Sequence, residues 1–136
     1  MTIQDDNSNP RFEPKSGWFA KFRYALNGLW CGIKSQSSFW VHLPAAIAVV
    51  CLGIILKVSS VELSVLLLCI ALVITLELVN TSIESLSKAV VRDFNEHVKI
   101  ALDASAAAVL VASVFSVVIG LVILLPKLLG LLGIVS

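Results

Sequence analysis

The sequence predicts an all-α membrane protein with three transmembrane helices preceded by an amphipathic surface helix. Hydrophobic residues make up 58% of the 136 residues and charged residues only 14%, whereas soluble domains contain roughly 45–50% apolar and about 25% charged residues. The apolar residues also gather in long runs separated by short polar segments, and a helix needs about 20 apolar residues to cross a bilayer. The bilayer is therefore expected to be the solvent for most of the chain.

The amino-terminal part is predicted to contain a tail and a surface helix. Residues 1–16 are polar and broken by Pro10 and Pro14, which is typical of a flexible tail. In residues 17–34 apolar side chains recur at helical spacing beside a polar edge that includes Lys21 and Lys34. Such a helix suits a membrane surface, although packing against protein alone would produce the same pattern.

One membrane domain is predicted over residues 17–126, with spans at about 39–56, 61–86 and 101–125. The pair Ser37–Ser38 is expected to cap the first span. Ser59 and Glu62 form a capping-box pattern before the second. Pro126 is expected to end the third, which leaves residues 127–136 as an apolar tail.

The distribution of basic residues predicts the orientation. Most Lys and Arg residues precede the first span or lie in the polar connector 88–99, and only Lys57 and Lys127 fall on the other side. By the positive-inside rule the amino terminus and this connector are cytoplasmic. The net charge of +1 also argues against a nucleic-acid partner.

The most informative feature is a row of polar residues in the second span. Glu77, Asn80, Thr81 and Glu84 stand at i, i+3, i+4 and i+7, so they share one helical face. Each carboxylate inside a span costs about 2.5–3.5 kcal/mol on insertion scales, and such residues usually serve a function. The structural alternative is that they hydrogen-bond a neighbouring helix and fix packing.

Two further polar residues accompany the spans. Asp103 opens the third span at the depth of the row, where it suits either a site or the favourable charge at a helix start. His42 at the start of the first span lacks metal-ligand spacing, so we interpret it as a hydrogen-bonded interface residue. The sequence contains neither GxxxxGK[ST] nor GxGxxG, so phosphate chemistry would need another scaffold.

Two motifs resemble those of a known family. The segment ELVNTSIE at 77–84 and the segment DASAAAVL at 103–110 match the ExxNTxxE and DxxxxAVL elements of the small prokaryotic diacylglycerol kinases and undecaprenol kinases. The resemblance extends over approximately residues 19–125, and the length, the three spans and the amphipathic leading helix agree with it.

The resemblance implies a homotrimeric kinase of the bacterial cytoplasmic membrane that transfers the γ-phosphate of ATP to a lipid hydroxyl, with Mg²⁺ as cofactor. It implies that Glu77 is the catalytic base, that Asn80 belongs to the same site and that Glu84 binds Mg²⁺. The residues that fall where the family contacts nucleotide are Tyr24, Glu84, Asp93, Asn95 and Asp103.

The chain departs from the family at two positions. Gln36 stands where a second magnesium-binding glutamate is usual, and Leu102 stands where a lysine is usual. Lys99, one turn earlier, would replace that lysine only if it reaches the same phosphates. Three readings remain: a kinase with a rearranged nucleotide site, a kinase for another lipid or alcohol, or a non-catalytic membrane protein. Because Glu77, Asn80 and Glu84 occur together, we favour activity on diacylglycerol or undecaprenol.

Overall fold

The computed structural model describes residues 17–134, so the predicted tail 1–16 lies outside the described residues. Within that range the chain forms helices and no strand, which confirms the all-α prediction. The elements are α1 (Trp18–Ser35), α2 (Phe39–Ile55), α3 (Ser60–Val90) and α4 (Glu96–Leu131).

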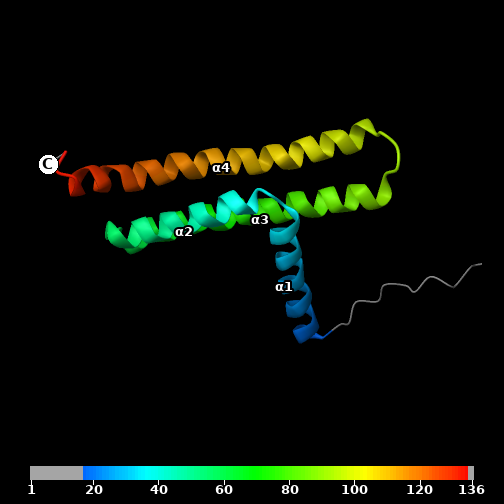
Figure 1. Cartoon of the computed structure of the whole chain (residues 1–136), viewed down its shortest axis with the longest axis horizontal. Coiled ribbons are helices and arrows are strands. Elements are labelled where there is room, and N and C mark those ends of the chain that lie inside the picture. Colours follow the sequence, from blue (N-terminus) through cyan, green and yellow to red (C-terminus); the bar gives the residue numbers. More distant parts are fainter. Residues whose placement is uncertain (1–16, 135–136) are drawn as a thin grey trace, which may run out of the picture.

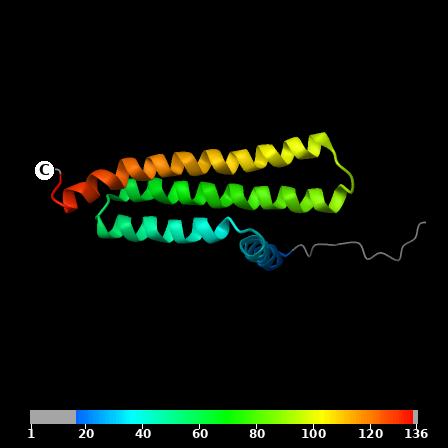
Figure 2. The same ribbon diagram turned by 45° about the horizontal axis from the view of Figure 1, so that its top comes forward.

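Three of the helices form an elongated bundle, and the first leaves it. Figure 2 shows α2, α3 and α4 side by side with α3 in the middle, and α3 packs most extensively against α4. In Figure 1 α1 projects away from the bundle, because the chain bends by 107° between α1 and α2. We call this bend, residues 36–38, the α1–α2 corner.

The lengths of the helices agree with an integral membrane protein. Helices α3 and α4 are each long and apolar enough to cross a membrane, and the bent pair of α1 and α2 is the third candidate. The 17 residues of α2 extend about 26 Å at 1.5 Å per residue, close to the roughly 30 Å of a hydrocarbon core. A surface helix followed by three spans is therefore compatible with the architecture.

Several predicted boundaries differ from the structure. Helix α4 continues through Pro126 to Leu131, so the prediction that this proline ends the helix is wrong. A proline removes one backbone hydrogen bond, but membrane helices tolerate prolines because neighbouring helices, side chains or a local adjustment of the helix satisfy the freed carbonyl. The predicted connector 88–99 shrinks to residues 91–95, because α3 and α4 extend into it from both sides.

One of the two predicted caps is present. The Ser59 hydroxyl accepts a hydrogen bond from the Glu62 amide at 3.3 Å, and the Glu62 carboxylate accepts one from the Ser59 amide at 2.6 Å, so the capping box is confirmed. Ser38 precedes α2 but makes no side-chain cap. Its backbone is already helical (φ −60°, ψ −32°), whereas a capping residue has extended backbone.

The buried interior of the described chain is small. Five hydrophobic residues are buried, and Phe39 and Leu66 are the largest of them. Gly32 permits the close approach of α1 to α3, since a Cβ there would lie 2.6 Å from Leu78 Cδ2. Most large apolar side chains face outward, as expected when lipid or another copy of the chain covers them.

Candidate functional site

The polar row lies on the inner face of α3. Glu77 is 3% exposed and Asn80 is 8% exposed, and they are the buried polar residues among the described residues. Glu84, one turn after Asn80, is half-buried. The spacing predicted from the sequence therefore places these side chains in the interior of the bundle and at its edge, rather than on the outer surface.

A chain of hydrogen bonds joins this row to its neighbours. The Asn80 amide donates to Glu84 Oε1 at 2.9 Å, and the Gln36 amide donates to Glu84 Oε2 at 2.6 Å. On the other side of Asn80, the Ser105 hydroxyl donates to Asn80 Oδ1 at 2.6 Å. The α1–α2 corner, α3 and α4 thus meet at the Glu84–Asn80 pair.

The corner brings Gln36 to this position. The backbone of Gln36 is extended (φ −116°, ψ 125°), and its backbone N–H ends α1 by donating to the carbonyl of Gly32. The absence of a side chain at Gly32 lets α1 lie against Leu78 of α3. Gln36, which follows one turn later, therefore reaches Glu84 from the end of α1.

Glu77 has a different neighbour. His42 Nε2 lies 3.5 Å from Glu77 Oε1, and their side chains are 22% and 4% exposed. The sequence interpretation did not place His42 in the site, because a lone histidine lacks a distinctive spacing. The Thr81 hydroxyl donates to the backbone carbonyl of Glu77 within α3 at 2.8 Å, so it takes no part in the hydrogen bonds between the side chains of the row.

The residues expected to contact nucleotide on α4 do not converge on the row within one chain. Lys99 and Asp103 form an ion pair at 2.7 Å on an exposed face. Asp103 precedes Ser105 by two residues, so it points about 200° around the helix from the residue that faces Asn80. Asn95 is the N-cap of α4 and accepts hydrogen bonds from the amides of His97 and Val98.

Tyr24 and Asp93, the other two residues expected to contact nucleotide, also lie away from the polar row. Tyr24 lies on α1 beside Arg23, whose guanidinium is 5.8 Å from the ring centre. It precedes Gln36 by twelve residues, or about 18 Å along a helix. Asp93 is exposed in the loop between α3 and α4.

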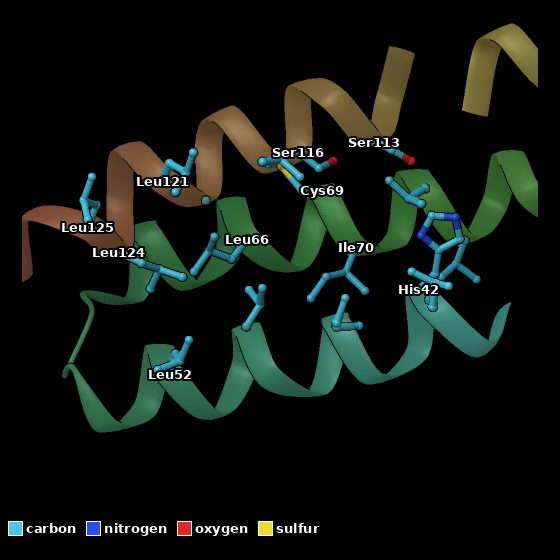
Figure 3. Close-up of a pocket in the computed structure, with 18 of the residues that line it drawn as sticks. His42, Leu52, Leu66, Cys69, Ile70, Ser113, Ser116, Leu121, Leu124 and Leu125 are labelled. Carbon is cyan, nitrogen blue, oxygen red and sulfur yellow. The ribbon is translucent and has the colours of Figure 1, made fainter. Parts of the chain in front are cut away.

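Two hollows flank the site. The first, which we call the α1–α3 hollow, has a volume of about 840 Å³, and the polar residues Gln36, Glu84, Ser85 and Lys88 help to line it. The second, the apolar groove, has a volume of about 510 Å³ between α2, α3 and α4 and is lined mainly by aliphatic side chains such as Leu66. Figure 3 shows His42 at one end of this groove and Leu124 and Leu125 toward the other.

The oxygen atoms at Glu84 fit a magnesium ion that ATP would help to hold. Residues 17–134 contain no group of three or more His, Cys, Asp and Glu side chains suited to a metal. Mg²⁺ prefers oxygen ligands, and it is often held by one or two carboxylates together with substrate phosphates. Glu84 supplies a carboxylate that uses one lone pair of each oxygen for its amide partners, and rotation of the Gln36 amide would present a further oxygen.

Comparison with known proteins agrees with the resemblance in the sequence. The family model described as prokaryotic diacylglycerol kinase matches residues 23–124. The undecaprenol kinase of Bacillus subtilis is 37% identical over 111 residues, which cover 82% of this chain and 90% of that protein. The diacylglycerol kinase of Synechocystis sp. is 38% identical over 112 residues, which cover 82% of this chain and 64% of that protein. No solved structure gives a match. This chain therefore belongs to the prokaryotic diacylglycerol kinase family.

Proposed function

We propose that this protein is an ATP-dependent kinase that phosphorylates the hydroxyl of a membrane lipid, diacylglycerol or undecaprenol, at the cytoplasmic face of the bacterial membrane. Membership of the family supports the lipid kinase activity. The observation in the structure that carries the proposal is a buried carboxylate, Glu77, beside His42 at the end of an apolar groove. This arrangement suits a substrate with a hydrocarbon body and one reactive hydroxyl.

In the proposed reaction Glu77 is the general base. A lipid whose chain lies in the apolar groove would present its hydroxyl near His42, and Glu77 would accept the hydroxyl proton. The lipid oxygen then bonds to the γ-phosphorus, the bond from that phosphorus to the β-phosphate oxygen breaks, and ADP leaves. His42 would orient the Glu77 carboxylate from 3.5 Å away.

Glu84 and its partners would hold the nucleotide end of the site. Glu84 is held by the side-chain amides of Gln36 and Asn80, and Asn80 is held in turn by the hydroxyl of Ser105. Phosphoryl transfer depends largely on such positioning and on electrostatics. In this proposal Glu84 and Gln36 are the protein ligands of magnesium. When bound, Mg²⁺ neutralises negative charge on the phosphate oxygens.

The proposed orientation places the polar end of the bundle at the cytoplasm, where ATP is found. It is supported by the basic residues of this end, among them Lys88, Arg92 and Lys99. On α1, Lys21 and Lys34 lie over the rings of Trp18 and Trp30, a composition that suits a membrane interface. A membrane-impermeant maleimide should modify Cys31 of α1 in inside-out vesicles and leave it unmodified in intact cells.

We also propose a homotrimer, as the resemblance implies. The outward-facing apolar side chains of the three bundle helices leave ample surface for contacts between copies. Chemical cross-linking in mild detergent is expected to yield a trimer as the largest abundant species. A chain that remains monomeric while phosphorylating lipid would contradict this part of the proposal.

Phosphate transfer from labelled ATP tests the function. The purified chain in detergent micelles is supplied with Mg²⁺ and either diacylglycerol or undecaprenol, beside the Glu77→Gln variant. We expect labelled lipid from at least one acceptor with the native chain, and a loss of roughly 10²–10⁴-fold in the variant, the usual contribution of a general base. Absence of transfer to both lipids would favour a non-catalytic membrane protein.

A further inference from the structure

Most of the basic side chains in residues 17–134 already have a partner. Lys21, Arg23 and Lys34 lie over aromatic rings, and Lys99 and Lys127 form ion pairs with carboxylates. Lys88 has no such partner among the described residues. It is also the one basic residue that lines the α1–α3 hollow, so it is available to an anion there.

The position of Lys88 relates it directly to Glu84. The two residues are four apart in α3 and therefore share a helix face. They form no ion pair with each other, and the Glu84 oxygens accept hydrogen bonds from Asn80 and Gln36 instead. One wall of the α1–α3 hollow thus carries a carboxylate suited to a metal and, one turn away, an unpaired ammonium group.

No basic residue of α4 lines the α1–α3 hollow. Lys99 is held by Asp103 on the exposed face of α4 and does not line the hollow. Magnesium and a cationic side chain commonly act together on the phosphates of ATP.

We propose that Lys88 binds the phosphates of ATP in the α1–α3 hollow. This inference rests on the proposed kinase function. A lysine binds phosphate as a mobile point charge, so a side chain at the rim of an open hollow suits the role. The competing structural role is compensation of the helix dipole, since Lys88 lies in the last turn of α3.

The test measures nucleotide binding and turnover in neutral detergent micelles without anionic lipid. Lys88→Gln should raise the KM for ATP and the Kd for the fluorescent analogue TNP-ATP by about tenfold or more, the usual scale for a lost hydrogen bond to a charged group. The KM for the lipid should not change, and Lys88→Arg should retain most of the affinity. Arg92→Gln is the matched control, because this exposed residue lies close in sequence but does not line the hollow.

Several results would overturn the assignment. Unchanged TNP-ATP affinity in Lys88→Gln, with only a lower melting temperature, would assign the residue to the helix dipole. A higher KM for ATP in Lys99→Gln alone would assign the phosphates to Lys99. A defect that emerges only after phosphatidylglycerol is added would assign Lys88 to a lipid headgroup. If the native chain itself does not bind TNP-ATP, the proposed function fails together with this inference.

Discussion

The carboxylate in the first turn of α3 and the two carboxylates in its second half have different partners. At the first turn Glu62 completes a capping box with Ser59 and lies 3.2 Å from the ammonium of Lys127. In the second half Glu77 contacts an imidazole, and Glu84 contacts two amides. Neither acid of the second half has a Lys or Arg partner in the part of the chain that the structure describes.

This difference separates a structural acid from acids that are available to a ligand. The charge of Glu62 is compensated by Lys127, and the same oxygen of Glu62 accepts a hydrogen bond from a backbone amide. Glu84 is held in place by neutral donors, which orient its charge without cancelling it. A charge kept inside a span without a fixed counter-ion indicates function.

The largest expected difference in activity is between the two variants Glu84→Gln and Glu62→Gln. Glu84→Gln should lower phosphate transfer by roughly 10²–10³-fold, the scale for loss of one preorganised electrostatic group. Glu62→Gln should leave transfer within about twofold of native, because it removes only the ion pair and a glutamine can still complete the capping box. Equal losses in both variants would remove the distinction between the two ends of α3.

A smaller effect is expected when the neutral partner of Glu84 becomes an acid. Gln36→Glu should lower the Mg²⁺ concentration for half-maximal transfer by about tenfold, because ligand charge governs the affinity for divalent cations. Without Mg²⁺ the two carboxylates should repel each other and loosen the α1–α2 corner. Magnesium titration of both proteins, with hydrogen exchange at the corner, measures the two effects. An unchanged magnesium requirement would mean that Gln36 does not face the metal.

A still smaller effect is expected when the hydrogen bond between α3 and α4 is removed. Ser105→Ala removes the hydrogen bond to Asn80 Oδ1 and should cost about 1 kcal/mol of stability, with transfer lowered several-fold as Asn80 loses its orientation. Ser113→Ala is the matched control on the same helix, since the buried Ser113 hydroxyl has no partner within residues 17–134. Thermal unfolding in micelles should show a decrease for Ser105→Ala alone. A greater loss at Ser113 would contradict this ranking.

The smallest effect is expected at the ion pair of the first turn. Lys127→Met should lower stability by about 0–1 kcal/mol, because both partners of the pair are about one-third exposed. Phosphate transfer per folded molecule should not change. A clear loss of turnover in this variant would show that the Glu62 end also serves the reaction.

Much of this arrangement follows from the sequence. Apolar runs and helical periodicity predict the helices, and the spacing of Glu77, Asn80 and Glu84 predicts their common face. The error at Pro126 arose because proline breaks helices in water more reliably than in an apolar span. The partners His42 and Ser105 depend on the register between helices, which no local pattern encodes. The same register turns Lys99 and Asp103 outward from α4.

We propose that Glu77 acts in the chemical step while Glu84 helps to hold the nucleotide. The most direct test measures both TNP-ATP affinity and lipid phosphorylation by Glu77→Gln in one preparation. We predict an affinity within about twofold of native and a transfer rate lowered at least about 100-fold, on the scale of a lost general base. A variant that phosphorylates lipid at the native rate, or that loses nucleotide affinity together with its transfer rate, would contradict this assignment of roles.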